Sequence, residues 1–451
     1  MLRVSQSRVV FVIASFALAA CHHPQASSDA DADDADGRDA GDGGSGDATP
    51  DSGGDAGRDG DHAADGDADA DADFDGDGDI LSIPCDRPTD FPPFRPAKVP
   101  LDGQMLFPVG FGGEPGPYVL GVDTGAVKTT LEERFVTESD GMIGRATIDF
   151  GYGLKLTDYE VLVGDLSDAS DHIGVEIHGL IGQDLFKRFY FGLDYVTPAV
   201  AMGAGTPDDP PPGYDADDGV DVPYVLEQEF PIVEVDVGGV PLRLIADTGS
   251  GVTIVVESSV PSELLDDGLE GYVWHTSYGS DPGVIVRLPS LTIGGATVED
   301  TWAVVIPDEH HLAQIFRLLG VDMQGFLGFP VYRRFFVSVI GCEDEFVFYP
   351  TANLDHIDGY EWDRVGVELV RTATETSIDM VYSPSDAADQ GVTPGDVLVA
   401  VDSAPTDGAA LDDIRLLLRG TPGETRELSL TREGVPVELT VAVDRLLPPL
   451  E

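Results

Sequence analysis

The sequence predicts a mainly β protein with two similar lobes, followed by a smaller β module that contains a helix. Short alternating or apolar runs are separated by Gly, Asp and Pro turns, which is typical of strands and hairpins. Helical patterns are few before residues 262–269 and 309–320. Two sequence elements also recur in the same order, which indicates an internal duplication.

The first 21 residues have the pattern of an export signal. Arg3 and Arg8 precede an apolar run, 9–20, that is too short to span a bilayer. The segment 18–21, Leu-Ala-Ala-Cys, resembles the lipobox of bacterial lipoproteins. This resemblance implies cleavage before Cys21, acylation of that cysteine, and a lipid-anchored protein of the bacterial cell envelope, at the outer membrane and facing the periplasm or the surface. An ordinary cleaved signal with a chance cysteine is the alternative.

Residues 22–82 form an Asp-, Ala- and Gly-rich linker with almost nothing to bury, so we expect it to be disordered and extended. The linker carries about a third of the net charge of −58, which argues against nucleic acid and anionic lipid as partners. The run DFDGDGDI, 73–80, has the first spacings of an EF-hand calcium loop. Pro84 stands where the bidentate Glu is needed, so a solvated acidic linker is favoured over a calcium site.

Three cysteines fit an exported protein. With Cys21 lipidated, Cys85 and Cys342 remain as an even pair in an oxidising compartment. A disulfide between them would close a loop of about 257 residues, and two buried free thiols are the alternative.

No Cys, His or carboxylate cluster has zinc spacing, so we expect no metal or cofactor, and solvated side chains at His310 and His311.

The motif Asp-Thr-Gly followed by a small residue occurs at 123–126 and again at 247–250, each time after an apolar run. In each copy a threonine follows at the same offset from the aspartate. Both copies continue through hairpins into a glycine-containing apolar signature, GLIGQDLFKRFYFGLDY at 179–195 and GFLGFPVYRRFFVSVIG at 325–341. The segment 206–219 links the two copies.

These motifs place a carboxylate at the end of an apolar strand, in a turn of small residues. Gly125 and Gly249 permit a tight turn, and Thr124 and Thr248 can hydrogen-bond to the backbone or to each other. Two such turns facing each other bring their carboxyl groups near contact, where both cannot ionise. One carboxyl then keeps a proton and acts as an acid, while the other acts as a base on a shared water.

Over about residues 90–350 the motifs resemble those of the retropepsin-like and pepsin-like aspartic proteases, with both lobes in one chain. The resemblance implies a catalytic pair, Asp123 and Asp247, between lobes at 83–207 and 214–352. It also implies a peptide or protein substrate and hydrolysis by an activated water, and we expect a monomer. Tyr152 and Tyr278 are both candidates for the flap that closes over substrate.

The C-terminal part, 358–448, resembles a PDZ domain of the permuted kind found in bacterial proteases. The matching positions are Ser383-Pro384, Ala387-Ala388, Gly391-Val392 and 394–398, then a helix over 411–419 and a hairpin through Gly434. The resemblance implies that an extended peptide adds to the sheet as a strand, with a groove near Val365, Gly366 and Val367. That segment lacks the full Gly-Leu-Gly pattern for holding a free carboxylate.

The sequence therefore predicts a lipid-anchored aspartic endopeptidase whose PDZ module recruits substrate or gates the cleft. Two alternatives remain open at this level. One is a catalytically inactive lipoprotein that binds peptide in the cleft, and the other is an envelope scaffold in which only the PDZ module binds.

Overall fold

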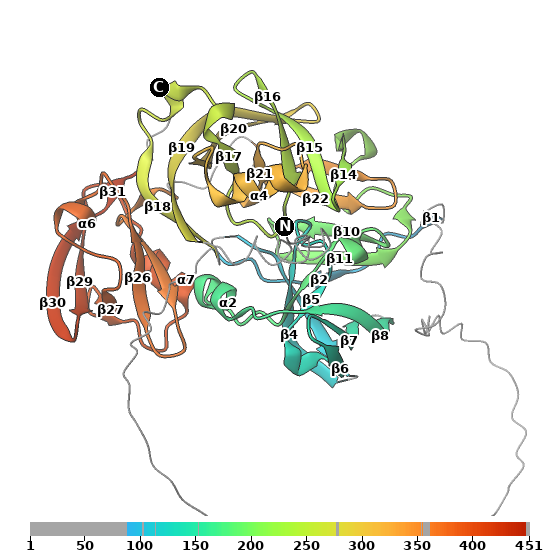
Figure 1. Ribbon diagram of the computed structural model, residues 1–451, viewed down its shortest axis with the longest axis horizontal. Coiled ribbons are helices and arrows are strands. Elements are labelled where there is room, and N and C mark those ends of the chain that lie inside the picture. Colours follow the sequence, from blue (N-terminus) through green and yellow to red (C-terminus); the bar gives the residue numbers. More distant parts are fainter. Residues whose placement is uncertain are drawn as a thin grey trace, which may run out of the picture. The chain divides into compact units, whose positions relative to one another are not determined.

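The computed structural model describes residues 88–447, apart from 102, 113, 152, 277–278, 353 and 355–360, and these residues belong to one compact unit. The predictions for the signal segment, the linker, Cys21, the run at 73–80, Cys85, Tyr152 and Tyr278 lie outside the described residues. The described part is mainly β, which confirms the predicted fold class (Figure 1).

The first lobe is built on one sheet whose described strands close on themselves. The strands are β3 (Leu106–Phe111), β4 (Glu114–Val122), β5 (Thr130–Leu131), β6 (Glu138–Asp140), β7 (Ile143–Gly151), β8 (Leu154–Val163) and β9 (Gly179–Ile181). Their order is β3-β4-β9-β5-β8-β7-β6, and β3 also pairs with β7. Short helices follow at η2 (Glu133–Phe135), α2 (Ser167–Ile173) and α3 (Gln183–Phe186). In β7 the buried residues Ala146, Ile148 and Phe150 alternate with more exposed ones, as a strand with one covered face requires.

The second lobe repeats this plan. Its strands are β14 (Val225–Glu227), β15 (Phe230–Val237), β16 (Val240–Ala246), β17 (Ile254–Val256), β18 (Leu269–Thr276), β19 (Gly279–Ile293), β20 (Ala296–Ile306) and β21 (Gly325–Leu327). The helices are η4 (Glu257–Ser259), η5 (Ser262–Leu264), α4 (His311–Leu319) and α5 (Phe329–Tyr332). The parallel pairs β4–β9 and β5–β8 of the first lobe recur as β16–β21 and β17–β20. The recurrence shows the internal duplication in three dimensions.

A six-stranded sheet joins the two lobes. It contains β2 (Phe94–Pro96), β10 (Phe189–Asp194), β11 (Ala199–Ala204), β13 (Val220–Pro223), β22 (Phe335–Ile340) and β23 (Glu345–Pro350), in the order β13-β23-β22-β10-β11-β2. At its centre β10 pairs antiparallel with β22, one strand from each copy, with Gly192 opposite Ser338. β11 pairs with β10 in the same register as β23 pairs with β22. The two copies are therefore related by an approximate twofold axis through the β10–β22 pair. Outside this sheet, β1 (Pro88–Thr89) pairs with β12 (Thr206–Pro207), and η3 (Ala216–Asp218) lies in the link.

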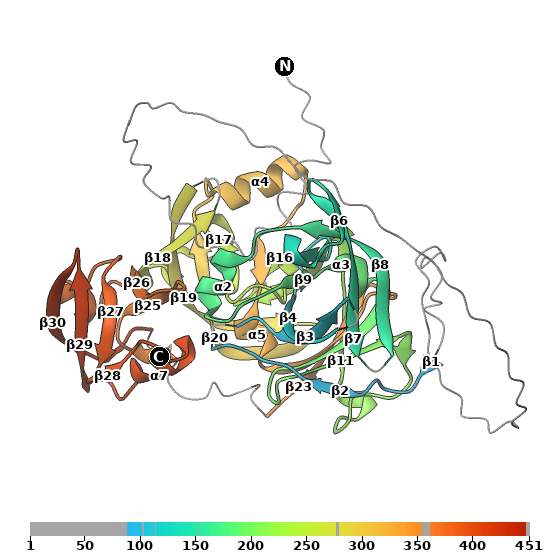
Figure 2. The same cartoon turned by 90° about the horizontal axis from the view of Figure 1, so that it is seen from below.

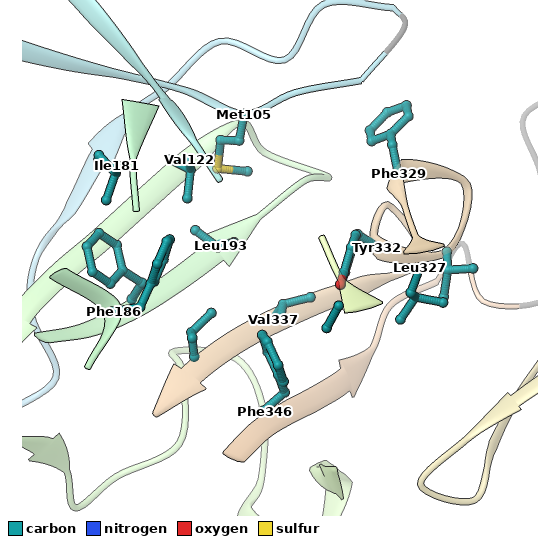
Figure 3. Close-up of a cluster of buried hydrophobic side chains, with 14 of the residues drawn as sticks. Met105, Val122, Ile181, Phe186, Leu193, Leu327, Phe329, Tyr332, Val337 and Phe346 are labelled. Carbon is teal, nitrogen blue, oxygen red and sulfur yellow. The ribbon is translucent and has the colours of Figure 1, made fainter. Parts of the chain in front are cut away.

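One continuous core runs through both lobes. Figure 3 shows part of it, with Met105, Val122, Ile181, Phe186 and Leu193 from the first copy and Leu327, Phe329, Tyr332, Val337 and Phe346 from the second. Each of the large apolar side chains stabilises the fold by roughly 1.5–3 kcal/mol when buried. The lobes therefore share their main source of stability.

The C-terminal module has its own sheet and its own core. Its strands are β24 (Asp363–Arg364), β25 (Val367–Arg371), β26 (Thr376–Val381), β27 (Val397–Val401), β28 (Ala404–Pro405), β29 (Thr425–Arg432), β30 (Val435–Ala442) and β31 (Asp444–Arg445), with helices α6 (Asp386–Asp389) and α7 (Leu411–Leu417). The main sheet runs β25-β26-β27-β29-β30, so β25 is an edge strand (Figure 2). Leu369, Ile378, Leu398 and Ile414 belong to the buried cluster that holds α7 on this sheet.

Three local observations complete the fold. Cys342 is disulfide-bonded, and its pairing with Cys85 stays a prediction because Cys85 lies outside the described residues. The expectation of a solvated His310 was wrong: this side chain is buried at the start of α4, where its Nδ1 accepts a hydrogen bond from the Leu312 N–H (3.1 Å). Among the described helices, none is both long and apolar enough to cross a membrane.

Candidate active site

Asp123 and Asp247 stand at equivalent strand ends. Asp123 follows β4 directly and Asp247 follows β16, and the last residues of both strands are fully buried. The Asp123 N–H donates to the carbonyl of Ile181 (3.1 Å), and the Asp247 N–H donates to the carbonyl of Leu327 (3.0 Å). Each aspartate is thus fixed where a parallel strand pair of its own lobe ends.

Within each motif the turn orients one carboxylate oxygen. The Ala126 N–H donates to Oδ1 of Asp123 (2.9 Å), and the Gly249 N–H donates to Oδ1 of Asp247 (2.9 Å). The turns themselves close through bonds from the N–H groups of Ala126 and Ser250 to the aspartate carbonyls (both 3.2 Å). These bonds hold both carboxyl groups on rigid backbone.

The two motif threonines connect the lobes. The N–H of Thr124 donates to Oγ1 of Thr248, and the N–H of Thr248 donates to Oγ1 of Thr124, each at 3.0 Å. Each hydroxyl then donates to a strand carbonyl of the opposite lobe, Thr124 to Ala246 (2.6 Å) and Thr248 to Val122 (2.8 Å). Because all four bonds are buried and reciprocal, they fix the distance between the motifs.

The motif glycines let the two carboxyl groups approach. A Cβ atom on Gly125 would lie 2.5 Å from Cγ of Asp247, and one on Gly249 would lie 2.4 Å from Cγ of Asp123. Real carbon atoms cannot come this close, so any larger residue at either glycine would push the opposite carboxyl group away. The structure therefore brings six of the predicted residues, the Asp-Thr-Gly triplets at 123–125 and 247–249, into one site.

The electrostatics of the pair favour a shared proton. Asp123 and Asp247 have no exposed surface, and burial raises the pKa of both carboxyl groups. The negative charge of Asp247 raises the pKa of Asp123 further. Oδ2 of each aspartate receives no hydrogen bond from a backbone N–H or from another described residue, and the two carboxyl groups are close enough to share a hydrogen bond with each other.

Two buried tyrosines border the pair. Burial raises the pKa of Tyr195 and Tyr332, and the charge of Asp247 raises both further, so their hydroxyl groups stay protonated. Their rings stack on each other with centroids 6.3 Å apart. Both residues belong to the repeated glycine signature, which was the sequence signal that could have identified them.

The first lobe carries an additional brace that sequence reasoning missed. Asp184 accepts hydrogen bonds on Oδ1 from the N–H (2.7 Å) and hydroxyl (2.8 Å) of Thr129, and on Oδ2 from the hydroxyl of Tyr159 (2.9 Å). Gln183 donates to the carbonyl of Thr124 in the active-site turn (2.6 Å). Both residues lie in the signature at 179–195, where a polar pair interrupts an apolar run.

The other predicted site residues lie elsewhere. Val365, Gly366 and Val367 precede and begin β25 in the C-terminal module, where the Val365 N–H donates to the carbonyl of Leu418 (2.9 Å) and the Val367 N–H to that of Val365 (2.7 Å). These two N–H groups are therefore engaged within the module. Within the part of the chain that the structure describes, no group of three or more His, Cys, Asp or Glu side chains is arranged to hold a metal.

Comparison with known families addresses the second copy of the motif. The family model described as aspartyl protease matches residues 233–331, which include Asp247, Thr248, Gly249 and the signature glycines Gly325 and Gly328. No match to the chain was found among the curated proteins. The family match and the strand arrangement around Asp247 together lead to the conclusion that the chain contains an aspartic protease-like domain.

Proposed function

We propose that this protein is an aspartic endopeptidase that hydrolyses peptide bonds with the pair Asp123 and Asp247. One observation carries the proposal: each carboxyl group lies against the glycine of the opposite motif, so the two acids are held together by both lobes. A surface turn that happened to contain Asp-Thr-Gly would have no reason to build this buried, reciprocal arrangement. Both aspartates come from one chain, so a monomer suffices.

The proposed reaction uses the pair as acid and base. The ionised carboxylate takes a proton from a water molecule as its oxygen attacks the scissile carbonyl carbon, while the protonated partner donates its proton to the carbonyl oxygen. The resulting diol collapses when the carboxyl group that took the water proton gives it to the amide nitrogen, the other carboxylate takes a proton from a diol hydroxyl, and the C–N bond breaks. Two aspartates that share one proton are the established behaviour of aspartic protease dyads, and the proton belongs to the pair rather than to one residue.

The surroundings support this chemistry. The pair is buried, so each charge interaction acts in a low-dielectric environment where it is stronger than in water. The turn N–H groups fix one oxygen of each carboxylate, which leaves the Oδ2 atoms to face the reacting groups. Little reorganisation is then needed when the transition state forms.

We further propose that the C-terminal module gates the site. β25, the edge strand to which a PDZ-like module would add a peptide, packs against α2 of the first lobe. Arg415 of α7 donates to the carbonyl of Leu369 in β25 (3.5 Å) and to that of His172 in α2 (2.9 Å). A peptide added at β25 would have to displace these contacts, so peptide binding and this docked arrangement exclude each other.

The proposed location is the bacterial cell envelope, with lipid on Cys21 as the anchor and the acidic linker as the tether. This part rests on the sequence pattern of residues 1–21 and on the linker composition. Labelling cells with a radioactive fatty acid would test it. Wild type should incorporate label, and Cys21→Ser should not.

The decisive experiment for the function is a cleavage assay with the full chain and a diverse peptide library between about pH 3 and 8, read by mass spectrometry. Asp123→Asn and Asp247→Asn should each reduce kcat/KM by at least about a thousandfold, because catalysis needs both members of the pair. Asp158→Asn is the matched control, since this carboxylate lies on the surface of the first lobe and pairs with Arg145.

Three results are informative. Loss of cleavage in both dyad variants but not in the control would support the mechanism. Cleavage that survives either dyad variant would overturn it. Wild type that retains peptides without cutting them would favour the inactive peptide-binding alternative.

A further inference from the structure

The C-terminal module contacts the second lobe near the active site. The rings of Trp302 in β20 and Trp362 in the module meet edge to face, with centroids 5.1 Å apart and planes at 90°. The indole N–H of Trp302 donates to Glu361 (3.1 Å). Backbone bonds between Glu270 and Ser383, 2.8 Å in each direction, tie β18 to the segment that follows β26.

The same module also contacts the first lobe. Besides the bond from Arg415 to the carbonyl of His172, the Leu101 N–H donates to Asp412 of α7 (3.3 Å). Gly174, which ends α2, lies so close to Leu411 that a Cβ atom would approach its side chain to 2.5 Å. The module thus bridges the two lobes (Figure 1).

A cavity of about 180 Å³ lies where these contacts meet. It begins at the second motif, since residues 249–250 of the motif and the next two residues, 251–252, form part of its wall. The lobes contribute the large side chains Tyr272, Trp302 and Phe329, and the module contributes Trp362, Met380 and Tyr382. Part of this apolar wall therefore comes from outside the two lobes.

Each charged side chain of the wall lies beside a polar or charged partner. Glu361 pairs with Arg333 (2.7 Å), Arg364 with Glu368, Arg415 with Asp412 (3.4 Å), and His172 lies 3.7 Å from Asp379. Gln104 differs from these groups: it is 2% exposed, and neither atom of its amide has a hydrogen-bond partner among the described residues. An unpaired buried amide is unfavourable, and a main-chain group of a bound peptide would supply the missing hydrogen bonds.

The duplication provides an internal control. Strand register makes Lys128 and Glu160 of the first lobe equivalent to Val252 and Trp302 of the second. The first pair is a partly exposed ion pair at the surface. The second pair is apolar and lines the cavity. The apolar replacement occurs at the place where the module covers the lobe.

From these observations we propose that the C-terminal module forms the outer wall of a substrate subsite for one bulky, neutral side chain, aromatic or large aliphatic. The inference rests on the proposed function and adds a specificity to it. An apolar cavity of about 150 Å³ accommodates a benzene ring, so this cavity can hold one aromatic side chain. An acidic or basic side chain would enter without a free counter-charge and is disfavoured.

Met380 is the position to alter, because it comes from the module, lines the cavity and lies outside the dyad. Met380→Trp fills the subsite, and Met380→Ala enlarges it. Met323→Ala is the matched control, since Met323 is a partly buried methionine of the second lobe that does not line this cavity. Each full-chain variant is assayed with peptides that differ only at one position near the scissile bond, after thermal unfolding has established that it is folded.

The expected result is a selective change. Met380→Trp should lower kcat/KM about tenfold or more for peptides with Phe, Tyr or Leu at one fixed position, and leave those with Ala there within about threefold. Met380→Ala should shift the substrate preference towards the largest side chains. Met323→Ala should leave the substrate preference unchanged. Unchanged preferences in an active Met380→Trp enzyme would overturn the inference but leave the dyad mechanism intact.

The inference remains testable if wild type does not cut. Retention of the same peptides would then be measured with wild type and Met380→Trp. Loss of binding only for peptides with bulky side chains would support the subsite although the proposed function had failed. Equal retention by both proteins, or no retention by wild type, would overturn the inference.

Discussion

The two lobes share one strand plan but differ in what surrounds it. Both hold an aspartate at the end of a buried strand and a threonine that bonds to the opposite lobe. Around this frame, the first lobe adds the polar brace centred on Asp184, whereas Pro330 of the second lobe occupies the equivalent place in α5. The second lobe instead has an apolar surface under the C-terminal module. Symmetry is thus kept at the aspartate pair and lost where each lobe meets a different neighbour.

The strongest test of this contrast compares equivalent positions, Trp302 and Glu160. Trp302→Ala should lower the free energy of unfolding by about 3–5 kcal/mol, because a buried indole and its packing are removed. Glu160→Ala should cost at most about 1 kcal/mol, since its ion pair with Lys128 is partly exposed. Urea unfolding followed by far-UV circular dichroism measures both. Similar costs at the two positions would contradict the contrast between the lobes.

The threonine brace should behave symmetrically. Thr124→Val and Thr248→Val each remove a hydroxyl that donates one buried hydrogen bond and accepts another, so each should cost about 2–4 kcal/mol. The two values should agree within about 1 kcal/mol, as the bonds are reciprocal. Thr137→Val, at an exposed hydroxyl, serves as the control and should cost less than about 0.5 kcal/mol. Clearly unequal losses of stability in the two variants would mean that the two threonines do not contribute equally to holding the lobes together.

The brace at Asp184 should matter to the first lobe alone. Asp184→Ala leaves the N–H and hydroxyl of Thr129 and the hydroxyl of Tyr159 without this acceptor, and we expect a loss of about 2–3 kcal/mol. Tyr159→Phe keeps the carboxylate and removes one bond, so about 1 kcal/mol is expected. Chemical denaturation of the full chain measures the stability loss of each variant. An Asp184→Ala protein as stable as wild type would show that the brace is dispensable.

The remaining prediction is a pH dependence of stability that both lobes create together. Folding raises the pKa of Asp123 and Asp247 above the unfolded value of about 3.9, so above that pH the native state binds more protons than the unfolded state. Stability should then fall as the pH rises through this window, by up to about 1.4 kcal/mol per pH unit for each proton. The double variant Asp123→Asn/Asp247→Asn lacks this contribution. Its stability relative to wild type should increase from pH 4 to pH 7, and a constant difference would contradict the raised pKa values.

The active-site frame was the part of the molecule most open to prediction. The proposed chemistry needs the same residues at the same strand ends in both copies, so the duplication itself points to Asp123 and Asp247. Asp184 gave no such sign, because its partners Thr129 and Tyr159 lie 55 and 25 positions away and only the fold brings them together. The same holds for the contact of Trp302 with Glu361, 59 positions apart. Aligning the two copies would have revealed a tryptophan in place of Glu160, but that alignment requires the strand register.

The central pairing of β10 with β22 also constrains how the chain acquires its structure. Tyr190 and Ser338, which contact each other across this pair, are 148 positions apart. A chain made from its N-terminus completes the first lobe long before β22 exists, and until then β10 is an open edge of the sheet. Because the pairing is nearly twofold symmetric, a β10 strand from another nascent copy presents much the same edge as β22. For β10, pairing with β22 of its own chain therefore competes with earlier pairing to β10 of a neighbouring chain. Crowded synthesis or slow translation of the second lobe would favour the pairing between chains.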